Sequence, residues 1–187
     1  MAASYDQLPP DLPVPEDDGA ADHLTGMELP PLELGVAGGG RFDLREAATI
    51  GTLVAFVYPR TGTPGQPLVP GWDDIPGARG CTSQSCAFRD TQAELAAHGA
   101  SLIGISAQTP QEQAEFAERE HISYPLLSDQ DLAVADAMGL PTFETSGLRL
   151  YKRLTFVAER GRIVKVFYPV FPPDANAGEV LAYLRSR

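Results

Sequence analysis

A chain of 187 residues is long enough for one domain with a full hydrophobic core and too short for two domains of ordinary size. Its 25 acidic and 14 basic residues give a formal net charge of −11. This balance argues against nucleic acid and anionic membranes as partners, because both select proteins with clustered Lys and Arg.

The N-terminal segment is predicted to form an arm outside the core. Residues 1–28 are acidic and rich in proline, and the first forty residues contain neither Lys nor Arg. A segment of this composition has little apolar surface to bury, so we expect an extended chain here. The folded domain is then expected over residues 29–187.

The sequence carries no sign of secretion or of a membrane span. Its first residues lack the basic and apolar regions of a signal peptide, and the best apolar run, Leu53 to Tyr58, is too short to cross a bilayer. We therefore expect a cytoplasmic protein. In a reducing compartment its two cysteines are expected to be catalytic, redox-active or inert rather than a permanent structural disulfide.

The first predicted core elements are a strand and a helix separated by a long loop. Residues 51–58 form a continuous apolar run, as in a buried central strand, and Pro59 ends it. A loop rich in Gly and Pro follows over 59–80. A helical pattern then runs from residue 81 to about 98 and stops at Gly99.

The order of strand and helix then repeats. A strand is predicted at 101–106, and a helix at 110–120 with Thr109 as its N-cap. The remaining patterns predict a short strand at 124–127, a helix at 129–138, a hairpin of 153–159 and 162–168 that turns at Arg160-Gly161, and a helix at 175–185. This order predicts an α/β, thioredoxin-like fold with a mixed central sheet and helices on both faces.

The two cysteines lie five residues apart at the predicted start of a helix. Unpaired N–H groups and the positive end of the helix dipole favour a thiolate there, which makes Cys81 a candidate nucleophile. Cys86 could convert an oxidised Cys81 into a disulfide before further oxidation. Residues five apart in a helix are separated by about 7.5 Å of rise, and bonded cysteines need Cα atoms within about 7 Å and suitably directed side chains. The helix start must therefore unwind for the bond to form.

Three segments resemble the peroxiredoxin pattern, specifically that of the peroxiredoxin Q (bacterioferritin comigratory protein) group. They are Tyr58-Pro-Arg-Thr-Gly-Thr-Pro-Gly65, Gly80-Cys-Thr-Ser-Gln-Ser-Cys-Ala-Phe-Arg-Asp90 and Arg153-Leu-Thr-Phe156, and the resemblance extends from about residue 29 to the C-terminus. It implies a thiol peroxidase in which Cys81 attacks hydrogen peroxide or an organic hydroperoxide. It further implies that Cys86 resolves the sulfenic acid as a Cys81–Cys86 disulfide, which thioredoxin or a similar dithiol reduces.

The same resemblance implies the other site residues. Arg153 completes the site, Pro59 shields the pocket, and Thr63 supplies a hydroxyl that hydrogen-bonds the peroxide and the thiolate. The resemblance implies no metal, haem or flavin cofactor. We expect the protein to act as a monomer.

An insertion separates this chain from that pattern. In the family, Thr-Pro-Gly runs directly into the reactive cysteine, whereas here residues 66–80 lie between Thr63-Pro64-Gly65 and Cys81. The position three before Cys81 is Ala78, which has no hydroxyl. Either the insertion returns Thr63 to the pocket, or another threonine replaces it, Thr61 or Thr82 being the nearest.

The insertion is predicted to be ordered. Trp72 gives it a large ring to bury, and its prolines reduce the entropy lost on ordering, so we expect a lid at the rim of the pocket. Arg89 and Asp90, beyond the second cysteine, are interpreted as a structural support beneath the active-site turn.

Other functions stay open on the residues alone. The leading alternative is a redox sensor or binding module that uses the same disulfide switch. A thiol–disulfide oxidoreductase ranks next, although those enzymes usually bring their cysteines together as C-x-x-C. A lone C-x₄-C is also compatible with an inert buried pair. A zinc site is disfavoured because the spacing differs from a C-x₂₋₄-C knuckle and the histidines are scattered, at His23, His98 and His121.

Overall fold

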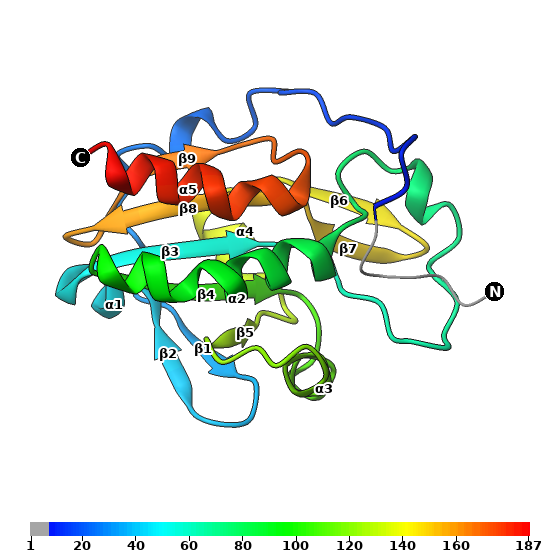
Figure 1. The fold of residues 1–187 in the computed structure, drawn as a ribbon, viewed down its shortest axis with the longest axis horizontal. Helices are drawn as coiled ribbons and strands as arrows, with labels where there is room; N and C mark the ends of the chain where they lie inside the picture. Colours follow the sequence, from blue (N-terminus) through cyan, green and yellow to red (C-terminus); the bar gives the residue numbers. More distant parts are fainter. Residues whose placement is uncertain (1–7) are drawn as a thin grey trace.

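The structure is a computed structural model that describes residues 8–187. Within this range one mixed sheet forms the centre of the fold, in the strand order β2-β1-β5-β4-β3-β8-β9 (Figure 1). Its strands are β1 (Glu33–Val36), β2 (Arg41–Asp43), β3 (Thr52–Val57), β4 (Ala100–Ser106), β5 (Leu126–Ser128), β8 (Leu154–Glu159) and β9 (Arg162–Phe167).

Helices cover both faces of this sheet. The long helices α2 (Cys81–Ala97) and α5 (Asn176–Arg185) lie side by side over one face (Figure 1). Leu44 of α1 (Leu44–Ile50) and Met138 of α4 (Ala133–Met138) are buried in the core on the other face. The remaining elements are α3 (Pro110–Arg119), the separate hairpin of β6 (Thr142–Thr145) and β7 (Leu148–Tyr151), and the 3₁₀ turns η1 (Asp22–Leu24), η2 (Trp72–Asp74) and η3 (Pro173–Ala175).

Strand β3 separates the two cores and positions the candidate site. Its side chains alternate between faces, as a strand requires, so that Phe56 packs with α2 and α5 while Ala55 packs with α1 and α4. Strand β8 runs antiparallel to β3, and its first residue, Leu154, pairs with Val57, the last residue of β3. The residues after β3 and the residue before β8 therefore meet at one end of the sheet.

The predicted fold class is confirmed, and most predicted elements are present. The helix at 110–119 begins with a full capping box between Thr109 and Glu112, and Pro110 occupies its first turn. The hairpin of β8 and β9 turns through Arg160 and Gly161, which both have positive φ angles, 52° and 73°. No helix among residues 8–187 is both long and apolar enough to cross a lipid bilayer.

Two predicted boundaries are wrong. The helix predicted at 129–138 begins only at Ala133, because the Asp129 carboxylate accepts hydrogen bonds from the N–H groups of Ala133 (2.8 Å) and Val134 (2.9 Å) and so caps the helix from outside it. The strand predicted at 124–127 occupies Leu126–Ser128. The sequence patterns also predict no element for the regions of β1, β2 and α1 or for the β6–β7 hairpin.

The expectation that the N-terminal arm stays out of the core is wrong for its second half. Leu24 is fully buried and Ala21 is 5% exposed, and both belong to the core on the α1 side of the sheet. Upstream, the Asp18 carboxylate accepts hydrogen bonds from Lys152 Nζ (2.6 Å) and the Tyr168 hydroxyl (2.7 Å). Two buried apolar side chains and the hydrogen bonds of Asp18 thus attach this segment to the fold. Residues 1–7 of the predicted arm lie outside the described residues, and the boundary at residue 28 stays a prediction.

The burial of Leu24 gives a test of this attachment. Leu24→Ala should lower the free energy of unfolding by about 2–4 kcal/mol, because it removes buried methyl groups and leaves a cavity. Val14→Ala, in the same arm but at a side chain that is 63% exposed, should change it by less than about 0.5 kcal/mol. Urea denaturation measures both. A loss below about 1 kcal/mol for Leu24→Ala would mean that this segment contributes little to the core.

Candidate active site

Cys81 is the first residue of α2, and the residue before it has to be glycine. Gly80 is the N-cap residue, with φ of 99°, and a Cβ built on it would lie 2.7 Å from Pro173 Cγ and 2.8 Å from Leu8 Cδ2. A left-handed glycine therefore turns the chain into the helix in a crowded space. This turn puts Cys81, which is 3% exposed, in the first turn of the helix, the end at which backbone N–H groups are unpaired and the helix dipole is positive.

Arg153 connects the Cys81 sulfur to the turn that precedes the helix. Its Nη2 donates to Cys81 Sγ at 3.1 Å and to the carbonyl oxygens of Ala78 and Arg79, each at 3.1 Å, while its Nε donates to the Gly77 carbonyl at 3.2 Å. Arg153 is 3% exposed. The Cys81 thiol donates to the Ala78 carbonyl at 3.6 Å. The structure thus brings together Cys81 and Arg153, as predicted, and clamps the guanidinium to the turn that precedes the helix.

A buried polar network behind Arg153 was not evident from the sequence. Arg153 Nη1 donates to Gln84 Oε1 at 2.5 Å, and Gln84 Nε2 donates to Asn176 Oδ1 at 3.0 Å. Thr155 Oγ1 donates to the same Asn176 oxygen at 2.6 Å, and Gln84, Asn176 and Thr155 are fully buried. Gln84 follows Cys81 by one helical turn, a spacing that could have identified it from the sequence. The network holds the guanidinium through Nη1, while Nη2 contacts the sulfur.

Cys86 lies further along α2 with charged neighbours of its own. Arg89 Nη1 donates to Cys86 Sγ at 3.6 Å and to the Glu120 carbonyl at 2.6 Å, and the Cys86 thiol donates to Glu120 Oε2 at 3.7 Å. Both cysteines are in the reduced form on one continuous helix. The predicted conflict between regular helix and disulfide therefore applies to this structure. Arg89 also bonds Asp90 at 2.9 Å, which is the main cause that raises its pKa.

The hollow at Cys81 is small and does not include Thr63. It measures about 10 Å³, room for about one water molecule, and its walls are Arg60, Gly62, Leu68, Trp72, Arg79, Gly80, Cys81 and Thr82. An adjoining hollow of about 150 Å³ shares four of these residues and is lined by Thr61 and Thr63 as well.

The other candidate residues, Thr61, Thr82 and Pro59, are all buried but lie in different surroundings. Thr61 is buried, and its Oγ1 donates to Gln108 Oε1 at 3.0 Å. Thr82 is buried and lines the hollow at Cys81. Pro59 is buried at the end of β3, where its carbonyl accepts a hydrogen bond from Ser106 Oγ at 3.0 Å.

The insertion is anchored as predicted and forms part of the rim. Trp72 is 4% exposed, and its ring centroid lies 6.2 Å from that of Phe143 on β6. Leu68 and Trp72 both line the hollow at Cys81. The insertion thus narrows the approach to the sulfur.

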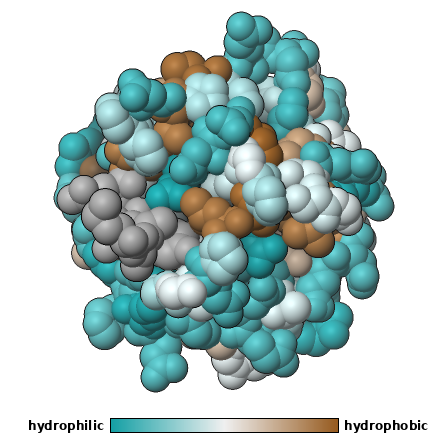
Figure 2. Space-filling model, turned by 90° about the vertical axis from the view of Figure 1, so that its right-hand side faces the viewer, coloured by the Kyte–Doolittle hydropathy of each residue, from teal (hydrophilic) through white to brown (hydrophobic). Residues whose placement is uncertain are grey.

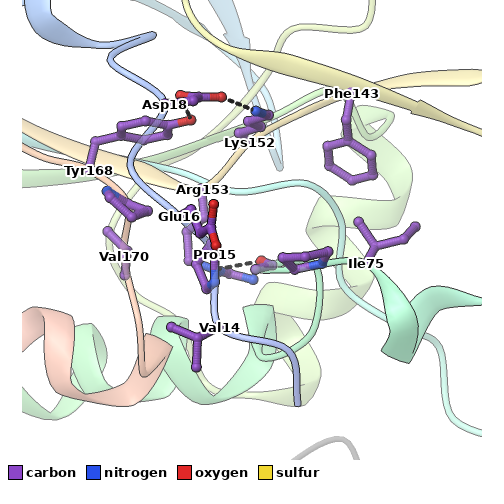
Figure 3. A pocket seen from close by; sticks show the side chains of 13 residues that line it. Val14, Pro15, Glu16, Asp18, Ile75, Phe143, Lys152, Arg153, Tyr168 and Val170 are labelled. Atoms are coloured by element: carbon purple, nitrogen blue, oxygen red, sulfur yellow. Dashed lines mark hydrogen bonds and ion pairs between the residues drawn. The ribbon is translucent and has the colours of Figure 1, made fainter.

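A wider pocket of about 460 Å³ reaches Arg153 but not Cys81. Figure 3 shows its side chains converging from the arm, the insertion, β6 and the segment after β9, with Asp18 joined to Lys152 and Tyr168 at one rim. Viewed from the end of the molecule that lies on the right in Figure 1, the surface shows hydrophobic residues gathered among hydrophilic ones (Figure 2). Among the described residues, no three of His, Cys, Asp and Glu come together as a metal site.

Comparisons with known proteins show which sequences and structures this chain is similar to. A family model described as Redoxin matches residues 24–181. A Mycobacterium tuberculosis protein whose name assigns it to the peroxiredoxins is 35% identical over 163 residues, which is 87% of this chain and 96% of its own length. The chloroplastic peroxiredoxin Q of Gentiana triflora is 34% identical over 137 residues, covering 72% of this chain and 54% of that protein. The crystal structure of peroxidoxin BcpB from Mycobacterium tuberculosis superposes with a TM-score of 0.70 at 34% identity, covering 87% of this chain and 96% of that one.

The crowding at Gly80 predicts a defect at the start of α2. Gly80→Ala should destabilise the protein by roughly 1–3 kcal/mol more than Gly99→Ala, because both positions have positive φ but only Gly80 lacks space for a Cβ. Alkylation of Cys81 by iodoacetamide should also slow in Gly80→Ala alone. Denaturation and alkylation kinetics measure the two effects. Equal losses in the two variants would show that φ, and not crowding, governs the turn.

Proposed function

The chain belongs to the redoxin family as a thiol peroxidase of the peroxiredoxin Q and Bcp kind, and on this basis we propose that it works through both cysteines. Cys81 reduces hydrogen peroxide or an organic hydroperoxide and becomes a sulfenic acid. Cys86 converts this acid into an intramolecular disulfide, and thioredoxin or a similar dithiol protein reduces the disulfide. The observation that carries the proposal is the 3.1 Å contact between Arg153 Nη2 and Cys81 Sγ at the start of α2.

The first step uses the contacts at Cys81. The thiolate attacks one peroxide oxygen, the O–O bond breaks, and the departing oxygen gathers negative charge and leaves as water or an alcohol after taking a proton. Arg153 is permanently charged, and its position is fixed by the carbonyls of residues 77–79 before the reaction begins. It can stabilise both the thiolate and the departing oxygen without reorganising.

The peroxide approaches through the two adjoining hollows in this proposal. Thr63 lines the hollow of about 150 Å³ and provides a hydroxyl on the way in. Pro59 is buried and lines neither hollow, so its role as a shield stays a prediction. Thr82 is the hydroxyl residue that lines the inner hollow with Cys81. We therefore assign Thr63 to the approach and keep its bond to the reacting oxygen as a prediction.

The second step changes the helix. Residues 81 and 86 lie on continuous helix, so the first turns of α2 have to unwind before the two sulfur atoms meet. The disulfide is then opened by thiol–disulfide exchange with an external dithiol, which completes the cycle without a cofactor.

The roles of the cysteines can be separated by substitution. Cys81→Ser should abolish peroxide reduction, because it removes the attacking thiolate. Cys86→Ser should still consume one equivalent of peroxide but accumulate sulfenic and higher acids at Cys81, detected by dimedone labelling and mass spectrometry. Turnover is measured with thioredoxin, thioredoxin reductase and NADPH. A disulfide that forms without turnover under any dithiol would instead favour a redox sensor, and full activity in Cys81→Ser would reverse the assignment.

The planar shape of the Arg153 guanidinium, as well as its charge, is expected to speed the attack on peroxide. Arg153→Lys keeps the positive charge but cannot bond the turn and the sulfur together, so peroxide attack should slow roughly tenfold to a hundredfold. Alkylation of Cys81 by iodoacetamide should be less affected, whereas Arg153→Met should impair both reactions. Lys152→Met removes the neighbouring cation, which bonds Asp18 and not Cys81, and should leave both rates unchanged. Stopped-flow kinetics measure the rate of peroxide attack. Equal rates in all variants would mean that Arg153 takes no part in the reaction.

A further inference from the structure

The sulfur of Cys86 lies between a cation and a carboxylate. Arg89 Nη1 approaches it at 3.6 Å from the next turn of α2, and Glu120 Oε2 faces it at 3.7 Å from the end of α3. The same Arg89 nitrogen donates to the Glu120 carbonyl at 2.6 Å, which ties the two helices together at this point. The Glu120 side chain is 16% exposed, so its charge acts in partly buried surroundings.

The other charged and titratable groups here have defined partners. The second oxygen of the Glu120 carboxylate, Oε1, bonds Arg119. Asp90 bonds Arg89 Nε at 2.9 Å. The Tyr124 hydroxyl donates to the Ser85 carbonyl at 2.8 Å, and burial raises the pKa of Tyr124 so that it stays neutral. Within the described residues, Glu120 Oε2 is the carboxylate oxygen that accepts the Cys86 thiol hydrogen bond.

A carboxylate beside a thiol needs an explanation if that thiol must become an attacking thiolate. The negative charge of Glu120 opposes ionisation of Cys86, whereas the positive charge of Arg89 favours it. A carboxylate at this place is useful if it takes the thiol proton during the reaction, since proton transfer to a positioned base lowers the barrier.

We propose that Glu120 is the general base of the resolving step, an inference that rests on the proposed role of Cys86. The Cys86 S–H bond breaks and its proton passes to Glu120 Oε2. The sulfur electron pair attacks the Cys81 sulfenic sulfur, the S–S bond forms and the S–O bond breaks. The departing hydroxide takes a proton from the protonated Glu120 and leaves as water, so that one thiol and one sulfenic acid give one disulfide and one water.

The packing around Cys86 keeps it near this base while the helix start moves. Ser85 is tied to Tyr124, and the fully buried ring of Phe88 stacks on Phe56 with centroids 4.6 Å apart. By contrast, the N-cap residue Gly80 gives the first turn no side-chain cap. Helix ends open before helix interiors. The turn that carries Cys81 is therefore the moving partner, and its release breaks the contacts of Gln84.

Glu120→Gln distinguishes a base from a mere neighbouring charge, because the two roles predict opposite effects. In a Cys81→Ser background, loss of the negative charge should move the pH profile of Cys86 alkylation to lower pH. With both cysteines present, the same substitution should slow disulfide formation after one equivalent of hydrogen peroxide, by about tenfold or more at neutral pH. Quenched-flow sampling with mass spectrometry of the unreduced protein measures the rate.

Two controls separate loss of a general base from loss of charge and from misfolding. Glu118→Gln removes the same charge from an exposed position on α3 and should change neither profile nor rate. Sulfenic acid formation at Cys81 should be equally fast in every protein that retains Cys81, which confirms that Glu120→Gln is folded. Disulfide formation by Glu120→Gln as fast as in the wild type, or faster, would overturn this inference alone. Absence of a Cys81–Cys86 disulfide in the wild-type protein would overturn the proposed resolving role and the inference with it.

Discussion

The site depends on one buried cation, the guanidinium of Arg153, whose hydrogen-bond donors and charge need partners within the fold. A guanidinium that is 3% exposed is stable inside a protein only if its donors are bonded and its charge is balanced. Arg153 meets this need with backbone carbonyls of the turn 77–79, with Gln84 and with the Cys81 sulfur. The end of the insertion, the start of α2 and the start of β8 therefore converge on one side chain. In the proposed function the Cys81 thiolate balances this charge, so the contact that stabilises the buried cation is also the one that the reaction uses.

This arrangement also links oxidation to release of the helix. A thiolate and a guanidinium make a charge-assisted hydrogen bond, which is about twice as strong as a neutral one. A sulfenic acid is formed as a neutral group, so in the proposed cycle peroxide reduction weakens the bond that holds Cys81 to Arg153. The same turn is anchored through Gln84 to Asn176 at 3.0 Å, and this second contact does not change with oxidation. In the proposed cycle the unwinding is therefore triggered at Cys81 and opposed at Gln84.

Local signals predicted most of the fold, and long-range contacts account for what they missed. The apolar run of β3, the capping box before α3 and the Arg160-Gly161 turn are each decided by neighbours in sequence. The Asp43 cap with Glu46 before α1 is a signal of the same kind that could have been read. Leu24 has no such signal, because its burial depends on a sheet formed by later residues. In the same way the helix-start position of Cys81 could be read from the sequence, and Arg153 was predicted beside it only through the family resemblance. The contact of Gln84 with Asn176, 92 positions away, has no signal in the sequence and comes from the structure.

The insertion explains how the site tolerates alanine where the family pattern has threonine. Ala78 contributes its carbonyl, which accepts hydrogen bonds from Arg153 Nη2 at 3.1 Å and from the Cys81 thiol at 3.6 Å. These are backbone contacts, so the identity of the side chain does not affect the support of the guanidinium. A hydroxyl donor for the peroxide is the part that Ala78 cannot supply. Thr82 and Thr63 line the inner and the adjoining hollow, and Leu68 and Trp72 of the insertion line both. The insertion therefore moves Thr63 away from the turn before the cysteine and adds an apolar wall to both hollows. In the proposed function this wall lies on the path of the peroxide to the sulfur.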